Sequence, residues 1–218
     1  MKNIKKTSAC YLLLCALLTT SLVGCAPLLI GGMAGTVAVA SDRRTSGIQL
    51  EDESIELRAS RQIRNVFGDR AHVNVNSFNL QVLLTGEVSN DKDRQSVAKL
   101  VSEVENVRSV LNELTIGPNS SFADRSHDLL VSGKIKATII DNKDLMVNSF
   151  KIVTEQGNVY LMGRVTQNEA NKATEIARNM SGVKKVTKVF QLMSDDELRV
   201  LNPPATSTPQ PETGARSK

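Results

Sequence analysis

An internal repeat is the feature of this sequence that most restricts its fold. The tetrapeptide Val-Asn-Ser-Phe at 75–78 recurs at 147–150, and Ile63 corresponds to Ile135 at the same distance upstream. Downstream, residues 82–88 correspond to 159–165, and spaced apolar residues continue the match to Val110 and Val186. Correspondence over this length predicts two homologous units, at about 51–116 and 126–193.

Both units have the same order of predicted elements. A first helix with apolar residues at helical spacing is expected at about 54–67 and 127–140. Two strands with alternating side chains follow, at 72–78 and 82–87 in one unit and at 145–153 and 158–164 in the other. The turn signal Glu155-Gln156-Gly157-Asn158 joins the second pair. The first unit lacks about five of the corresponding residues, which predicts a shorter hairpin.

A second helix and a last strand complete each unit. The expected N-caps are Asn90 or Asp91 in one unit and Thr166 in the other. Asn106 and Gly182 are expected to end the helices, because these residue types best tolerate a left-handed cap. The last strands are 107–116 and 183–192. The predicted fold class is therefore α+β: two tandem α-β-β-α-β units, each a three-stranded sheet with two helices on one face.

The N-terminus has the layout of a secretory signal. Lys2, Lys5 and Lys6 precede an apolar run at 9–18, which is shorter than the roughly 20 residues that a membrane-spanning helix needs. The tetrapeptide at 22–25, Leu-Val-Gly-Cys, resembles the lipobox of bacterial lipoproteins. That resemblance implies cleavage after residue 24 and lipidation of Cys25. The alternative is an ordinary secreted protein with a chance cysteine near its cleavage site.

The residue after the lipidated cysteine bears on sorting. It is Ala26 and not Asp, which by resemblance to lipoprotein sorting favours the outer membrane. A thioether-linked lipid together with acylation of the new N-terminus anchors far more firmly than one chain alone. Residues 25–50 are interpreted as a lipidated Gly/Ala-rich tether, 117–125 as a linker and 194–218 as a disordered Pro/Ser/Thr-rich tail.

Removal of the signal changes the composition. The whole chain has 27 Lys and Arg against 23 Asp and Glu, a formal charge of +4, but three of the lysines lie in the signal. The mature chain is thus near +1, and no nucleic-acid partner is expected. Cys10 and Cys15 leave with the signal, so Cys25 remains as the single cysteine and no intramolecular disulfide can form.

The order of elements, the Leu-x-Gly-x-Val pattern after each hairpin and Ser-Gly-Val-Lys-Lys-Val at 181–186 resemble the BON domain. Two such domains behind a lipobox resemble the dual-BON-domain outer-membrane lipoproteins. The resemblance extends to about residue 193. It implies a non-enzymatic, periplasm-facing protein that maintains envelope integrity and gathers at division sites. It also implies that the second BON domain binds anionic phospholipid such as phosphatidylglycerol or cardiolipin.

The resemblance also implies where the lipid binds, on the first helix of the second domain. The matching positions are Leu130, Val131, Ser132, Lys134, Ile135, Lys136 and Ile139. By this resemblance, a representative of the family carries Trp at the position where this chain has Leu130. Because Trp favours the membrane interface, the substitution implies shallower insertion here.

The charges and the apolar pattern favour lipid binding by the same helix, independently of the family resemblance. The first unit has 8 basic and 11 acidic residues, whereas the second has 10 and 6, and a basic residue near an anionic bilayer contributes about 1 kcal/mol. One helix face cannot bury 129–131 together with Ile135 and Ile139, so one or two of these residues should point outward beside Lys134 and Lys136. The alternative is that they pack on the linker or the other domain and that the lysines are only solvated.

The sequence predicts no enzyme, no cofactor, no small-molecule substrate and no metal site. His72 and His127 have no partner cysteine and no HExxH spacing. The glycines at 31, 32 and 35 fall in the tether with no preceding strand, so they do not predict a phosphate-binding loop. A second functional class stays open: a module that docks an outer-membrane assembly factor through its acidic first unit and the edge of its sheet. A periplasmic chaperone is a weaker third hypothesis.

Overall fold

The computed structural model describes residues 42–201, which belong to one compact unit that begins at Val39. The predicted signal, Cys25, most of the tether and the chain after residue 201 lie outside the described residues. No described helix is long and apolar enough to cross a bilayer.

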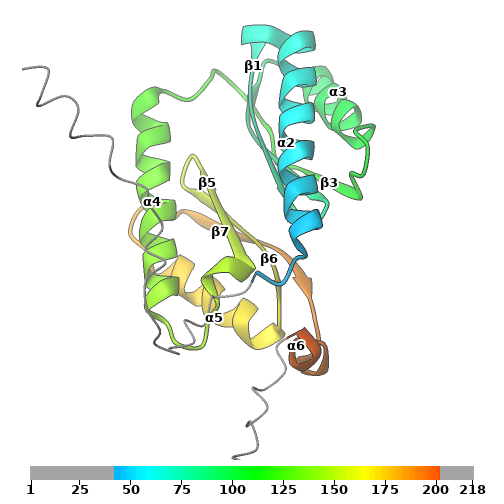
Figure 1. The fold of residues 1–218 in the computed structure, drawn as a ribbon. Helices are drawn as coiled ribbons and strands as arrows, with labels where there is room; N and C mark the ends of the chain where they lie inside the picture. Colours follow the sequence, from blue (N-terminus) through cyan, green and yellow to red (C-terminus); the bar gives the residue numbers. More distant parts are fainter. Residues whose placement is uncertain (1–41, 202–218) are drawn as a thin grey trace, which may run out of the picture. The chain divides into compact units, whose positions relative to one another are not determined.

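The first domain is a mixed sheet with two helices on one face (Figure 1). Strand β1 is antiparallel to β2, and β2 is parallel to β3 and β4. The elements are α2 (Ser46–Phe67), the 3-10 turn η2 (Gly68–Arg70), β1 (Ala71–Phe78), β2 (Gln81–Val88), α3 (Asp91–Ser102), β3 (Ser109–Asn112) and β4 (Thr115–Ile116).

The second domain repeats this arrangement, with β5 antiparallel to β6 and β6 parallel to β7. Its elements are α4 (Phe122–Asp141), the 3-10 turn η3 (Val147–Ser149), β5 (Phe150–Glu155), β6 (Asn158–Val165), α5 (Gln167–Arg178) and β7 (Lys185–Leu192), followed by α6 (Asp195–Leu201). The predicted α-β-β-α-β order and the α+β class are confirmed in both domains.

Each domain has its own apolar core between helices and sheet. In the first, every fourth residue of α2 from Ile55 to Phe67 packs on Val82 and Leu84 of β2. In the second, Val131, Ile135 and Ile139 of α4 pack on residues such as Leu161 of β6. A third cluster joins side chains of both sheets: Phe78, Leu83, Tyr160, Met162 and Val189.

A buried aspartate on the first helix of each domain holds the hairpin loop. Asp52 accepts hydrogen bonds from the backbone N–H groups of Asn79 and Leu80, at 2.7 and 2.8 Å. Asp128 accepts the equivalent bonds from Gln156 and Gly157, at 2.7 and 2.9 Å. Both loops have two residues with positive φ, a conformation that suits tight hairpins.

The equivalent aspartates correct the alignment of the repeat. The copy of Val-Asn-Ser-Phe at 75–78 ends β1, whereas the copy at 147–150 forms η3 and only enters β5. The tetrapeptides are therefore not structurally equivalent, and Ile63 corresponds to Ile139 and not to Ile135. The prediction of a shorter first hairpin is wrong as well, because both loops have equal length. Between the aspartate and the hairpin loop the second domain has one additional residue, because Asp52 and Asn79 are 27 positions apart whereas Asp128 and Gln156 are 28 apart.

The ends of several elements also differ from expectation. Helix α2 begins at Ser46, with the Thr45 side chain accepting from the N–H of Ile48, so the last tether residues are helical. The last strand of the first domain is divided, because Leu114 between β3 and β4 turns into the core. Helix α6 occupies part of the segment expected to be disordered, where Ser194 and Glu197 cap each other.

Candidate functional site: the exposed face of helix α4

Helix α4 starts at a capping box and buries one face. Ser121 Oγ accepts from the N–H of Asp124, whose carboxylate in turn accepts from the N–H of Ser121. Asp128, Val131, Ile135 and Ile139 recur along the helix on the side that meets the sheet. Because the cap stabilises the first turn locally, the opposite side does not need to be polar for the helix to form.

The opposite side of α4 carries large apolar residues in water. The exposed fractions of the four residues are 83% for Phe122, 74% for Leu129, 64% for Leu130 and 58% for Ile140. Phe122, Leu129 and Ile140 share one side of a helix with 3.6 residues per turn, and Leu130 adjoins them. We refer to these four residues as the apolar stripe. It follows the helix for about 27 Å, at about 1.5 Å per residue.

The seven positions expected to contact lipid differ in their exposure to solvent. Leu130, Lys134 and Lys136 are exposed. Val131, Ile135 and Ile139 are at most 1% exposed and belong to the core. Such side chains cannot touch a membrane while the domain stays folded.

Ser132, the remaining position, is half-buried, and its Oγ lies 2.7 Å from Thr154 Oγ1 of β5. Within 129–131, Leu129 and Leu130 point outward and Val131 inward, as the limited width of one face predicts. Sequence reasoning missed Phe122 and Ile140. The signal that could have found them is their shared helical side with Leu129, five turns from end to end.

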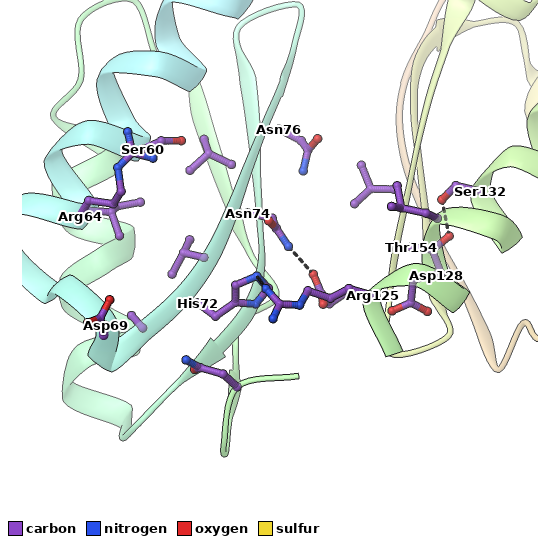
Figure 2. Close-up of a pocket in the computed structure, with 18 of the residues that line it drawn as sticks. Ser60, Arg64, Asp69, His72, Asn74, Asn76, Arg125, Asp128, Ser132 and Thr154 are labelled. Carbon is purple, nitrogen blue, oxygen red and sulfur yellow. Dashed lines mark hydrogen bonds between the residues drawn. The ribbon is translucent and has the colours of Figure 1, made fainter. Parts of the chain in front are cut away.

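A concave site also lies beside the start of α4, separate from the apolar stripe. A groove of about 780 Å³ is lined by α2, β1, β5 and the first turns of α4 (Figure 2). His72, Asn74 and Arg125 point toward one another there, and Asn74 Nδ2 donates to Glu155 Oε2 over 2.7 Å. The lining is mixed, with polar groups next to apolar residues such as Val73 and Ile152.

Charged groups at this groove interact closely. His72 Nδ1 lies 3.0 Å from Glu87 Oε2, and His72 Nε2 lies 3.2 Å from Nη1 of Arg125. Burial raises the pKa of the Glu155 carboxyl, and the negative charge of Glu87 adds to the effect, although the hydrogen bond from Asn74 acts in the opposite direction. The groove is thus lined by the His72 imidazole and the Glu155 carboxyl, and the buried Glu87 carboxylate contacts His72.

Comparison with known proteins agrees with the two-domain architecture. The BON domain matches residues 52–118 and 127–193. The outer membrane lipoprotein DolP of Haemophilus influenzae is 38% identical over 177 residues, which is 80% of this chain and 92% of that protein. A 21 kDa hemolysin of Actinobacillus pleuropneumoniae is 31% identical over 68% of this chain and 78% of its own length.

Among solved structures, CdsD, a structural protein of the type III secretion system of Chlamydia trachomatis, is 13% identical. The match covers 67% of this chain and 97% of that one, with a TM-score of 0.28. A likeness of this size supports no inference about function. The family matches and the two copies of the fold lead to one conclusion: the chain belongs to the BON domain family and carries two BON domains in tandem.

Proposed function

We propose that this protein is an outer-membrane lipoprotein, anchored through Cys25 with its domains facing the periplasm, whose second BON domain binds anionic phospholipid. The lipobox-like tetrapeptide supports the anchor, and the similarity to DolP supports the outer membrane. In this role the protein maintains envelope integrity without a catalytic step. Phosphatidylglycerol and cardiolipin are the proposed lipids, and membranes rich in them at division sites would recruit the protein.

The observation that carries this proposal is the apolar stripe beside Lys134 and Lys136, on a helix whose other face is wholly buried. An exposed apolar patch of this kind marks an interaction surface. Removing one large apolar side chain from water contributes about 1.5–3 kcal/mol, and each lysine near an anionic surface adds about 1 kcal/mol. The second domain is the basic one, with 10 basic and 6 acidic residues in 128–193.

The lipid anchor makes a modest affinity sufficient. A tethered domain meets the membrane at a high effective concentration, so α4 can associate and dissociate without loss of the protein from the bilayer. For the same reason, the contact of α4 has to be measured without the anchor. A chain that begins at Val39 suits this purpose, since it keeps the compact unit with both cores and lacks Cys25.

Vesicle flotation tests the proposal. The Val39–Lys218 chain should float with phosphatidylcholine vesicles that contain phosphatidylglycerol or cardiolipin, less so at high salt, and not with phosphatidylcholine alone. Leu130→Glu and Lys134→Glu should each weaken flotation with no fall in melting temperature. Leu57→Glu is the matched control, because Leu57 on α2 of the first domain is 67% exposed. Equal flotation of wild type, L130E and K134E would contradict the proposal.

A second candidate function rests on the first domain. Leu50, Leu57 and Val66 of α2 are 55–68% exposed in a domain with 8 basic and 11 acidic residues. Such a surface suits a protein partner, for which an outer-membrane assembly factor is our proposal. Site-specific crosslinking from Leu57 to one envelope protein, together with no flotation of the Val39–Lys218 chain, would favour this candidate over lipid binding.

A further inference from the structure

Three side chains from three strands meet beside the groove, which His72 and Glu155 line. His72 of β1 and Glu87 of β2 are direct partners in the antiparallel register, and Glu155 is the last residue of β5 in the other domain. Each offers one nitrogen or carboxylate oxygen, and these atoms lie within 4.8 Å of one another. Residues that are separated in the sequence thus assemble one cluster of ligand atoms.

The two carboxylates are buried and held in place. Glu87 is 1% exposed and Glu155 is 6% exposed. Neutral donors orient both groups, because Gln156 Nε2 donates to Glu87 Oε1, the N–H of Ser120 donates to Glu87 Oε2, and Asn74 Nδ2 donates to Glu155 Oε2. Amide and backbone donors fix the orientation of a carboxylate without neutralising its charge, which is the arrangement that supports metal ligands in proteins.

A buried hydroxyl lies beside the same cluster. Thr85 lies on β2, two residues before Glu87 and on the same side of the strand. Its side chain is fully buried, and its hydroxyl makes no hydrogen bond of good geometry within the described chain. An interaction with Thr85 acts to lower the pKa of the Glu155 carboxyl, against the rise that burial causes, so the hydroxyl faces the cluster. Buried hydroxyls without a well-formed hydrogen bond are uncommon in folded proteins.

We propose that His72, Glu87 and Glu155 form a binding site for a divalent transition metal ion, with Zn²⁺ as the best fit. One imidazole and two carboxylates are a ligand set that Zn²⁺ accepts, with a water or the Thr85 hydroxyl as the fourth ligand. Bonds of about 2.1 Å in a tetrahedral site put ligands about 3.4 Å apart. His72 Nδ1 and Glu87 Oε2 are already 3.0 Å apart, and the most distant pair of ligand atoms, at no more than 4.8 Å, needs to close in by up to about 1.4 Å.

Binding of the ion rearranges the protons and charges around His72. In the arrangement without the ion, one ring nitrogen faces Glu87 and the other faces Arg125. An ion bound at Nδ1 takes the place of the proton on that nitrogen, and the neutral ring then carries its single proton on Nε2, with no net release of a proton. Nε2 then no longer accepts from Arg125, whose exposed guanidinium turns to water. The positive charge of Arg125 also repels the ion and lowers the affinity of the site.

The site has a route for the ion and a structural consequence. His72, Asn74, Arg125 and Glu155 line the groove, so the cluster opens to solvent along it. Two ligands come from the first BON domain and one from the second. A bound ion therefore links the two domains, and it stabilises the folded two-domain unit by an amount that rises with the logarithm of the free ion concentration.

Calorimetric titration of the Val39–Lys218 chain with ZnCl₂ tests the proposal. This chain has no cysteine, so no thiol competes for the metal. We expect saturation at about one ion per chain, a raised melting temperature, and no comparable binding of Ca²⁺, which prefers oxygen ligands alone. His72→Gln and Glu155→Gln should each weaken Zn²⁺ binding at least tenfold, and Arg125→Gln should strengthen it.

His127→Gln is the matched control, since His127 is the other histidine of the chain and is exposed. It should bind Zn²⁺ as the wild type does, and the circular dichroism of every variant should show a folded protein. Zn²⁺ binding by folded E155Q with wild-type affinity would overturn the proposal. So would no saturable binding by the wild type, or loss of binding in H127Q alone.

Discussion

Arg43 and Glu169 form a buried, doubly hydrogen-bonded ion pair across 126 positions of the sequence, with N–O distances of 2.8 and 2.6 Å. Arg43 precedes α2 of the first domain, and Glu169 lies in the first turn of α5 in the second. Nη1 of Arg43 also donates to the carbonyl of Arg164 over 2.9 Å. Because Arg43 and Glu169 are 6% and 7% exposed, the pair binds the chain that leads into the first domain to the second domain.

Replacing Arg43 tests the contribution of this pair to stability. Arg43→Ala leaves the Glu169 carboxylate buried without its cation, and breaking a buried pair costs about 3–5 kcal/mol. Thr166 still donates to Glu169, so we expect a loss at the lower end, about 3 kcal/mol in the free energy of unfolding by urea. Arg61→Ala, an exposed position on α2, is the control. A loss in R43A no larger than in R61A would disprove the prediction.

The same pair predicts a dependence of stability on pH. Burial acts to raise the pKa of Glu169, but hydrogen bonds from Arg43 and Thr166 outweigh it and hold the pKa below the ordinary value of 4.5. The stabilisation is thus present above about pH 4.5, and it is lost as the pH falls through the lowered pKa of the folded state. Urea unfolding between pH 7 and pH 3 should show Glu169→Gln less stable than wild type at neutral pH. The difference should shrink in acid; a constant difference would refute the assignment.

The aspartates that hold the hairpin loops provide a third test. Asp128→Ala removes the acceptor of two backbone N–H groups, and hydrogen bonds to a charged group contribute about 1.5–3 kcal/mol each. We expect a loss of about 3 kcal/mol from the free energy of unfolding. Asp128→Asn keeps one acceptor oxygen and should lose about half as much. Asp141→Ala, at the exposed end of α4, should change stability by less than about 0.5 kcal/mol.

Two glycines should respond to alanine in opposite directions. Gly86 has φ +111°, and a Cβ there would lie 2.0 Å from the carbonyl oxygen of His72. Gly86→Ala should therefore unfold the first domain or destabilise it by more than about 3 kcal/mol. Gly133, inside α4, has open space around the position of a Cβ, so Gly133→Ala should stabilise the protein by about 0.5–1 kcal/mol. Thermal unfolding of both variants measures this contrast, and a stable G86A would contradict it.

Features that depend on a few neighbouring residues could be predicted from the sequence. Asn90 and Thr166 are the N-caps of α3 and α5, and Asn106 and Gly182 have the expected positive φ, although both helices end four residues earlier. The N-cap assignments succeed because an N-cap is a contact between residues two or three positions apart, whereas the predicted helix ends are wrong, since the C-caps are Glu103 and Asn179. Helix α6 shows the limit of composition as a guide, since a local capping box starts a helix within a segment whose composition predicts disorder.

The sequence by itself determined the repeat, the α+β class and the N-caps of the helices. The repeat and the class depend on the periodicity of apolar residues, and the N-caps depend on neighbouring side chains. Only the tertiary structure decided which leucines of α4 meet water, because that depends on the rotation of the helix against its sheet. It also decided that Asp52 and Asp128 are equivalent, where an identical tetrapeptide indicated a different alignment. The meeting of His72, Glu87 and Glu155 likewise requires strand register and contact between the domains. No spacing along the chain encodes such a contact.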